Sequence, residues 1–329
     1  MTLLWEPVQL GLYARSSNEI SSVTKSIANL CNMPIRVLKH IKEITMNSYI
    51  EINHTRTCDC PNKFLSCLPP REWMKCQIGV WEFKYEQRDV RDKNLHPATF
   101  PIALPKKIIE LFTHKGELVL DPFVGSGTTL VAAQDCERNA IGFDLNEKYI
   151  ELSKSRIVDN SAIKAIAICD DARNISNYIA PKTVKLIVTS PPYANILNHQ
   201  RTNKSRRGDE RHNEQYGKIE QYSQDPRDLG ILEAPIFENA ITEVFSNLKP
   251  VLRDDSNVLI NITDAWIDKK RVPLHINIVN AMRTAGYSLK NTIIWDRRNI
   301  VNRIGIFGWP TNYITMGTTF EYILNFVKD

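Results

Sequence analysis

The feature that most constrains this fold is a series of short apolar segments, each ending in a polar residue, between residues 117 and 189. Four of these segments are predicted strands, at 117–121, 139–144, 165–169 and 184–189. Helical patterns follow the first two, and strands that alternate with helices build a parallel, doubly wound sheet. The sequence therefore predicts an α/β, Rossmann-like fold with a mostly parallel sheet, whose ligand lies at the carboxyl ends of the strands.

The rest of the chain divides into a helical N-terminal region and the continuation of the α/β domain. Residues 1–69 show helical apolar spacing around a break at Pro34, which resembles a helix-turn-helix; plain helix packing is the alternative. Residues 70–329 are predicted to form the domain that holds the sheet. Within it, residues 195–230 are a polar insert without periodicity, and such a long loop is typical of a functional segment. Residues 320–327 are expected to close the sheet as an edge strand.

Composition narrows the class of protein. Apolar residues make up 43% of the 329, which is enough for a sizeable core, and no run approaches the ~20 apolar residues of a membrane helix. The net charge of +5 is only a weak indication of a polyanionic partner, so we expect any phosphate-binding surface to be a local patch. Neither end resembles a signal peptide, and we expect a cytoplasmic protein with reduced thiols.

Four of the seven cysteines lie close together in the sequence, at Cys58, Cys60, Cys67 and Cys76. Their spacing, C-x-C-x6-C-x8-C, lacks the paired C-x-x-C knuckles that are typical of zinc sites. The sequence therefore predicts free thiols and no metal site, with a zinc site as the less favoured alternative.

A Gly-rich turn joins the first predicted strand to its helix, in the sequence Asp121-Pro-Phe-Val-Gly-Ser-Gly-Thr-Thr129. Its glycines let the backbone approach a ligand, and the helix start offers unpaired N–H groups and a positive dipole end. The turn lacks the Gly-Lys-Ser/Thr of a phosphate-binding P-loop. Asp144 ends the next strand, where an acid binds ribose hydroxyls in dinucleotide-type sites, and Asp171 follows the third strand, suitably placed for an adenine amino group. Taken singly, each acid is better explained as a helix cap or a solvated turn. Together they predict a pocket for adenosine joined to an amino acid.

A second motif, Thr189-Ser-Pro-Pro-Tyr193, ends the fourth predicted strand. The two prolines make the backbone rigid and donate no N–H, so the carbonyl groups and the Ser190 hydroxyl are left as acceptors. Tyr193 adds an aromatic plane beside them. Acceptors next to a stacking surface suit a flat base with an amino group, whereas the alternative is simply a rigid loop.

The two motifs resemble the cofactor and catalytic motifs of amino-methylating DNA methyltransferases, written D-P-F-x-G-x-G-T-T and D/N/S-P-P-Y. Residues 96–101 and the helix after them resemble the family's segment over the methionine end of the cofactor, and residues 319–324 resemble its closing strand. The similarity spans about residues 70–327 and implies S-adenosylmethionine as the cofactor. It implies cofactor-binding roles for His96, Phe100, Pro101, Asp121, Pro122, Phe123, Gly125, Ser126, Gly127, Thr128, Asp144, Leu145 and Asp171.

The resemblance also implies the chemistry of the second motif. Ser190 and the Pro191 carbonyl would accept the two hydrogens of an exocyclic amino group on a flipped-out base, and Tyr193 would stack on that base. The chain has no Pro-Cys dipeptide, which ring-carbon methylation of cytosine would use. Serine at the first motif position favours N4 of cytosine, with N6 of adenine as the alternative. The predicted catalytic residues are Ser190, Pro191, Pro192 and Tyr193.

Recognition of the substrate is expected outside these two motifs, because too few residues separate them for a recognition domain. We expect DNA contacts from the insert and the N-terminal region, with double-stranded DNA as the partner and no membrane. The resemblance adds a cognate restriction endonuclease, acting on the same site, as a candidate partner. Two other readings stay open: an RNA or protein-amide methyltransferase, and a non-catalytic DNA-binding regulator. The predicted DNA-binding residues, otherwise a solvated charge run, are Arg201, Lys204, Arg206, Arg207 and Arg211.

Overall fold

The structure is a computed structural model, and its described part belongs to one compact unit, Tyr49–Asp329. The described residues are 49–61, 63–86, 89, 100–192, 225–267, 270–299, 308–309, 312–313 and 317–329. Residues 49–69, which the sequence analysis placed in the N-terminal region, therefore lie in the same unit as the sheet. The predicted helix-turn-helix lies outside the described residues.

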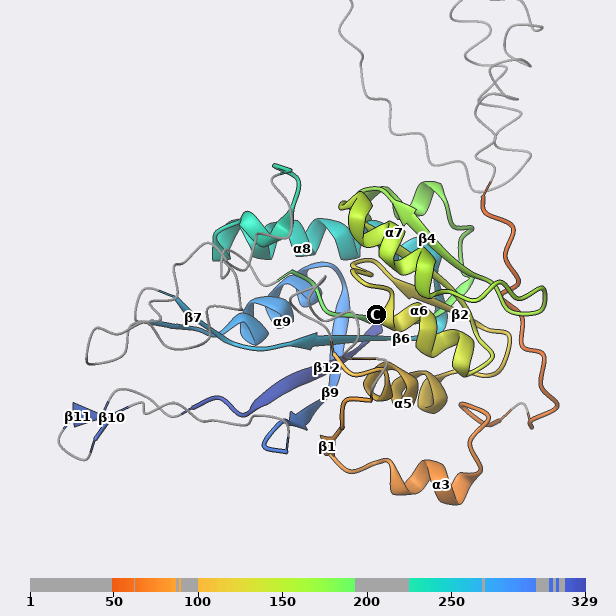
Figure 1. The fold of residues 1–329 in the computed structure, drawn as a ribbon, viewed down its shortest axis with the longest axis horizontal. Helices are drawn as coiled ribbons and strands as arrows, with labels where there is room; N and C mark the ends of the chain where they lie inside the picture. Colours follow the sequence, from red (N-terminus) through yellow and green to blue (C-terminus); the bar gives the residue numbers. More distant parts are fainter. Residues whose placement is uncertain are drawn as a thin grey trace, which may run out of the picture. The chain divides into compact units, whose positions relative to one another are not determined.

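An eight-stranded sheet forms the centre of this unit, in the order β1-β9-β12-β6-β5-β2-β3-β4 (Figure 1). Every neighbouring pair is parallel except the two pairs that include β12. This topology confirms the predicted doubly wound, mostly parallel α/β fold. The strands are β1 (Val80–Glu82), β2 (Leu118–Asp121), β3 (Asn139–Asp144), β4 (Ala165–Cys169), β5 (Val184–Thr189), β6 (Leu252–Ile262), β9 (Tyr287–Asp296) and β12 (Phe320–Lys328).

Strand β12 lies inside the sheet, so the prediction of an edge strand at residues 320–327 was wrong. It pairs antiparallel with β6 on one side and with β9 on the other, and the edges are β1 and β4. The polar residues of β12 do not indicate exposure. Glu321 is buried, accepts a hydrogen bond from Asn261 and pairs with Arg297. The strand returns between two earlier strands because its apolar side chains, such as Phe326, can then be buried on both faces.

Helices cover both faces of the sheet, and strands β6, β12 and β9 run between α9 and α5 (Figure 1). One layer holds α5 (Ala103–Phe112), α6 (Thr128–Asp135) and α7 (Glu147–Arg156); the other holds the 3₁₀ turn η1 (Ala172–Asn177), α8 (Ala234–Leu248) and α9 (Leu274–Thr284). Short elements complete the unit: α3 (Pro70–Lys75), η2 (Leu229–Ile231), η3 (Lys249–Val251), and two hairpins, β7 (Ala265–Ile267) with β8 (Lys270–Val272) and β10 (Gly308–Trp309) with β11 (Asn312–Tyr313). Among the described helices, none is long and apolar enough to cross a membrane.

The alternation of side chains along β2 shows how the two layers share one sheet. Val119 packs in the cluster beneath α5 and α6, whereas Leu118 and Leu120 pack in the cluster beneath α8 and α9. All three are fully buried, as expected for a parallel strand covered on both faces. The connection that follows β2 contains α6 and covers one face of the sheet. The connection that follows β5 contains α8 and covers the other face, and β2 and β5 are neighbours in the sheet. This arrangement opens a crevice at their carboxyl ends, where doubly wound proteins bind ligands.

Candidate active site

A pocket lies at the carboxyl ends of β2, β3, β4 and β5, where the two predicted motifs meet. Residues of the Gly-rich turn, of the turns after β3 and β4, and of the Ser-Pro-Pro turn all contribute to its wall. The lining residues are Pro122, Phe123, Asp144, Leu145, Asn146, Tyr149, Asp170, Asp171, Ala172, Pro192, Asp228 and Leu229. Segments that are far apart in the sequence thus form one cavity, because parallel strands bring their carboxyl ends to the same edge.

The Gly-rich turn bends sharply between β2 and α6. Gly125 and Gly127 have φ angles of 49° and 81°, in the left-handed region that favours glycine. A Cβ at position 127 would also lie 2.8 Å from Ser153 Oγ and 3.0 Å from Ser153 Cα on α7. Ser153 Oγ in turn donates to the carbonyl of Gly125 at 2.8 Å. Glycine at 127 therefore serves both the turn and the close packing of α6 on α7.

Asp121 is buried between the two motifs. Its Oδ2 accepts a hydrogen bond from Thr129 Oγ1 on α6 at 2.6 Å, and its Oδ1 accepts from Thr189 Oγ1 at the end of β5, also at 2.6 Å. The amide of Phe123 donates to Oδ1 as well, at 3.1 Å. Burial raises the pKa of Asp121 to about 6, although these three donors favour its charged form. Asp121 therefore fixes the position of the Gly-rich turn relative to the Ser-Pro-Pro turn.

Two further acids border the pocket where the sequence predicts them. Asp144 accepts from the amides of Gly125 and Asn146, at 3.0 and 2.9 Å, and burial raises its pKa to about 6. Asp171 caps η1, and its Oδ1 accepts from the amide and Nε of Arg173. Among the described residues no hydrogen bond reaches Asp171 Oδ2, so this oxygen is available to a donor on a ligand.

The pocket wall is more acidic than the sequence analysis expected. Asp170 and Asp228 line it together with Asp144 and Asp171. Asp228 is buried, accepts from the amide of Gly230 at 2.7 Å, and has its pKa raised by burial. No local signal marked Asp228, since it lies at the far end of the polar insert. Asp170 was visible beside Asp171, and Asn146 could have been found as the N-cap of α7. Tyr149, Ala172 and Leu229 also line the pocket without having been predicted.

Four other predicted cofactor-binding residues, Ser126, Thr128, Phe100 and Pro101, do not line the pocket. Ser126 and Thr128 are buried, and both hydroxyl groups lie within hydrogen-bonding distance of Arg156 Nη1, at 3.0 and 3.4 Å. Phe100 is half-buried and packs against the apolar cluster beneath α5, and Pro101 is buried. Of the second motif, Ser190 is half-buried and Pro191 is buried beside Pro192. His96, Tyr193 and the five basic residues of the insert lie outside the described residues.

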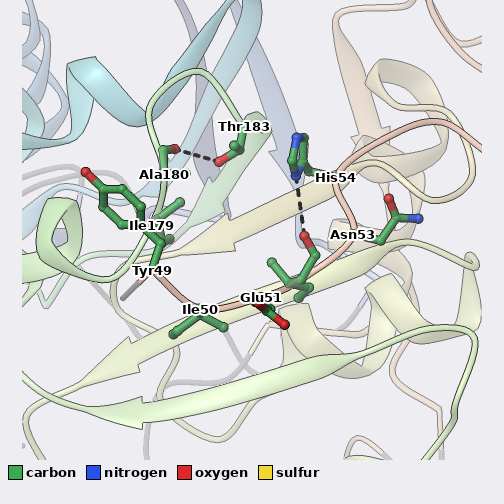
Figure 2. Close-up of a pocket in the computed structure, with 9 residues that line it drawn as sticks. Tyr49, Ile50, Glu51, Asn53, His54, Ile179, Ala180 and Thr183 are labelled. Carbon is green, nitrogen blue, oxygen red and sulfur yellow. Dashed lines mark hydrogen bonds between the residues drawn. The ribbon is translucent and has the colours of Figure 1, made fainter. Parts of the chain in front are cut away.

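A second hollow lies near the amino end of β5 (Figure 2). It is lined by Ile179, Ala180 and Thr183 on one side and by residues 49–54 on the other. Thr183 directly precedes β5, so this hollow is at the amino end of that strand, whereas the acidic pocket is at the carboxyl end. None of the described residues that the sequence predicts for a site lines it. The chemistry that the two motifs indicate therefore belongs to the acidic pocket.

Comparison with known proteins connects this pocket to one enzyme family. The family model described as DNA methylase, of the N6/N4 kind, matches residues 36–155 and 184–329. Among curated relatives, the Type II methyltransferase M.BglI of Bacillus subtilis is 43% identical over 91 residues, 27% of this chain and 25% of that protein. M.HpaI of Haemophilus parainfluenzae is 40% identical over 79 residues, 24% of this chain and 25% of that protein. The matched segments thus span about a quarter of the length of these relatives.

Two solved structures are similar to this chain at low sequence identity. TrmN from Thermus thermophilus is 14% identical with a TM-score of 0.44, over 73% of this chain and 53% of that one. The magnesium protoporphyrin IX methyltransferase ChlM from Synechocystis is 12% identical with a TM-score of 0.37, over 69% of this chain and 76% of that one.

The family match includes the Gly-rich turn and the Ser-Pro-Pro turn, whereas β4 and the turn after it lie in the unmatched residues 156–183. The chain accordingly belongs to the N6/N4 DNA methylase family, the amino-methylating DNA methyltransferases.

Proposed function

We propose that this protein is an S-adenosylmethionine-dependent DNA methyltransferase that methylates N4 of cytosine. One observation carries the proposal: Pro192 of the Ser-Pro-Pro turn lines the same pocket as Pro122, Phe123 and Asp144. The turn that would position a base and the groups that would hold a methyl donor therefore border a single cavity. Family membership supports DNA as the substrate.

The pocket residues fit S-adenosylmethionine. The cofactor carries a cationic sulfonium and an ammonium group, which suit a wall lined by four aspartates, Asp144, Asp170, Asp171 and Asp228. Asp144, at the end of β3, would accept from the ribose hydroxyls, and Asp171 Oδ2 would accept from the adenine amino group. The first turn of α6 offers N–H groups and a positive dipole end to the carboxylate. When bound, the cofactor supplies an activated methyl group.

The chain's own residues would make the amino nitrogen of the base able to attack. That nitrogen is a poor nucleophile while its lone pair is delocalised into the ring. Ser190 Oγ and the Pro191 carbonyl would accept its two hydrogens, which directs the lone pair at the methyl group. Tyr193 would stack on the flipped base. Asp121 would act as a positioning residue, because its bonds to Thr129 and Thr189 hold the two turns together.

The choice of cytosine N4 rests on serine at the first position of the second motif, whereas adenine N6 is the alternative within the family. The test is methyl transfer from labelled S-adenosylmethionine to duplex DNA, followed by digestion to nucleosides and mass spectrometry. We expect N4-methylcytosine in DNA and no transfer to RNA of the same sequence. Label in N6-methyladenine alone would overturn the base assignment, and label in RNA alone would overturn the substrate class.

Ser190→Ala tests the proposed catalytic role. We expect methyl transfer to fall by about a hundredfold or more, because a hydrogen-bond acceptor is lost at the reacting nitrogen. Binding of S-adenosylmethionine, measured by calorimetry, should stay unchanged, since the substitution removes a contact to the base. The control is Ser161→Ala, at an exposed serine away from the pocket, which should keep full activity. Full activity in Ser190→Ala would mean that another group accepts the amino hydrogens.

A further inference from the structure

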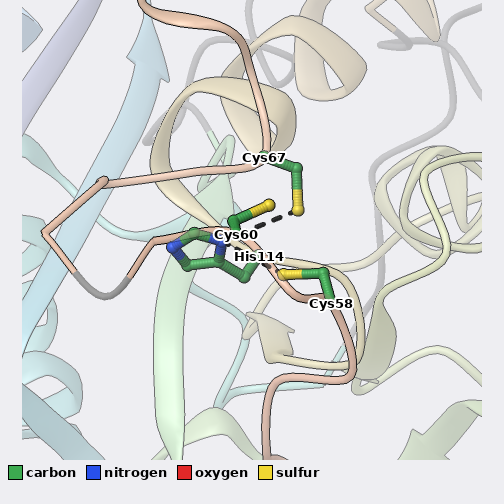
Figure 3. Close-up of side chains that lie close together, drawn as sticks. All are labelled: Cys58, Cys60, Cys67 and His114. Carbon is green, nitrogen blue, oxygen red and sulfur yellow. Dashed lines mark hydrogen bonds between the residues drawn. The ribbon is translucent and has the colours of Figure 1, made fainter.

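Three cysteines and a histidine come together on the side of the sheet away from the pocket. Cys58, Cys60 and Cys67 belong to residues 49–69, which we call the strap, and His114 follows α5 (Figure 3). One ligand atom from each of the four residues lies within 4.8 Å of each of the others. The side chains point at a common centre, with the three sulfur atoms and the imidazole around it (Figure 3).

Two distances between the ligand atoms fit tetrahedral coordination. With Zn–S bonds near 2.3 Å and Zn–N bonds near 2.0–2.1 Å, a tetrahedral site places a sulfur about 3.6 Å from a ligating nitrogen. His114 Nδ1 lies 3.4 Å from Cys58 Sγ and 3.6 Å from Cys67 Sγ. These two distances match the expected spacing, and all four ligand atoms lie within 4.8 Å of one another.

The imidazole of His114 is oriented by its other nitrogen. Nε2 lies 2.9 Å from the carbonyl oxygen of Phe64, and a carbonyl only accepts, so Nε2 carries the proton in this contact. In the neutral ring, Nδ1 then bears a lone pair directed at the cysteines. A hydrogen bond from the distal ring nitrogen to a backbone carbonyl is the usual outer-shell partner of a zinc-bound histidine. His114 is buried, with 4% of its surface exposed, so this orientation is held by packing.

Backbone contacts also hold the strap close to the loop that contains His114. The amide of Lys115 donates to Cys67 Sγ at 3.3 Å, and the amide of Thr57 donates to the Lys115 carbonyl at 2.8 Å. Gly116, with a φ of 82°, lets the strap approach closely, because a Cβ there would lie 2.6 Å from the carbonyl oxygen of Thr55. The described residues of the strap form no helix or strand, so few regular hydrogen bonds hold it in place.

We propose that Cys58, Cys60, Cys67 and His114 bind one zinc ion that fastens the strap to the loop before β2. Four protein ligands leave no open position, so the ion is structural and takes no part in methyl transfer. Three thiolates and one imidazole favour zinc over magnesium or calcium, which prefer oxygen ligands. The sequence analysis favoured free thiols because the cysteine run lacks paired C-x-x-C knuckles, and the fourth ligand, His114, lies far outside that run. Cys76, which that run suggested, packs against the apolar cluster beneath α5 instead.

The first test is the metal content of the full-length protein, expressed in zinc-supplemented medium and purified without chelator. We expect close to one zinc per chain by plasma mass spectrometry. Replacement of zinc by cobalt should give the visible bands of tetrahedral cobalt and a thiolate-to-cobalt charge-transfer band. The cobalt spectrum needs no substitution, so it tests the site even if ligand variants fail to fold.

Cys60→Ser tests the ligand set directly, and Cys76→Ser is its matched control, since both cysteines are half-buried and lie in the same stretch of chain. Cys60→Ser should lose zinc to a chelator at a concentration that leaves the wild type loaded, and Cys76→Ser should behave as the wild type. Metal at the level of the buffer blank in the wild-type protein, or a disulfide among Cys58, Cys60 and Cys67 in unreduced peptide maps, would overturn the proposal. Equal zinc retention in Cys60→Ser and Cys76→Ser would overturn the assigned ligands.

Discussion

At the scale of single residues, the structure gives Asp121 a role that its motif position alone does not suggest. The carboxylate is enclosed, and both of its oxygens accept from threonine hydroxyls on different elements. Such a group stabilises a particular arrangement of two turns while carrying a cost for its own charge. The raised pKa of Asp121, about 6, records that cost.

Asp121→Asn should therefore change how stability depends on pH. The pKa of Asp121 in the folded protein, about 6, lies above the ordinary value of 3.8. The stabilising contribution of Asp121 to the free energy of unfolding is therefore fully present below about pH 3.8 and is lost as pH rises through 6. Asparagine keeps an acceptor for Thr189 and Phe123 and can donate to Thr129, without a charge. As pH rises from about 4 to about 8, we expect the free energy of unfolding of the variant to increase relative to that of the wild type by on the order of 3 kcal/mol. Urea unfolding at each pH is the measurement.

The comparison of variant with wild type removes the titrations that the two proteins share, including that of Asp144. Asp254→Asn is the control, because Lys328 and Lys182 lower the pKa of Asp254 to about 2, outside the pH range of the test. Its stability difference from wild type should stay level over that range. A level difference for Asp121→Asn as well would show that its carboxyl group is not held at a raised pKa.

At the scale of secondary-structure elements, the packing of α6 on α7 determines the shape of the Gly-rich turn. Ser153 on α7 occupies the space that a side chain at 127 would need, and its hydroxyl group also bonds to Gly125. Arg156, one turn further along α7, donates to the Ser126 carbonyl at 2.7 Å. The turn that borders the pocket is thus held from the side by a helix that the motif does not include.

Gly127→Ala should destabilise the protein by about 2–4 kcal/mol, from the left-handed backbone and the contact with Ser153. Gly79→Ala is the matched control, because a Cβ at 79 meets nothing within 4 Å, and it should cost less than about 0.5 kcal/mol. Urea unfolding of both variants at neutral pH is the measurement. If the two substitutions lower the free energy of unfolding by the same amount, neither the backbone conformation nor the packing at position 127 requires glycine.

At the scale of the whole molecule, charge is distributed unevenly. The chain carries a net charge of +5, yet the pocket wall holds four aspartates. A pocket enclosed by protein strengthens the interaction of such acids with a cationic ligand. S-adenosylhomocysteine, the demethylated product, lacks the sulfonium charge, so the acids should favour the methyl donor over the product.

Asp228→Asn should reduce that preference. The asparagine oxygen can still accept from Gly230, so the cap of η2 is kept while one negative charge is removed. We expect the affinity for S-adenosylmethionine to fall about fivefold, on the order of 1 kcal/mol, and the affinity for S-adenosylhomocysteine to fall less. Calorimetric titrations with both ligands give the ratio. Asp254→Asn, at an exposed acid on the amino-end side of β6, should leave both affinities as in wild type, and an unchanged ratio in Asp228→Asn would count against an electrostatic role of the pocket acids.

The amino-acid sequence alone was enough to predict the fold class, the four strands that lead to the pocket and the two motifs that border it. These features are local: apolar periodicity decides strand or helix, and Gly125, Gly127 and the two prolines restrict the backbone where they stand. Because parallel strands end at one edge, the meeting of Pro122, Asp144 and Pro192 could be inferred without coordinates. Strand β1, with only three residues, was too short to leave a periodic signal.

Which distant segments become neighbours could be seen only in the folded chain. The tertiary structure placed β12 between β6 and β9, brought Asp228 to the pocket from the end of the insert, and set His114 against Cys58 and Cys67. Each of these contacts joins residues that no local pattern relates. They arise because burying both faces of an eight-stranded sheet forces the chain to return over itself, and the return path selects the partners.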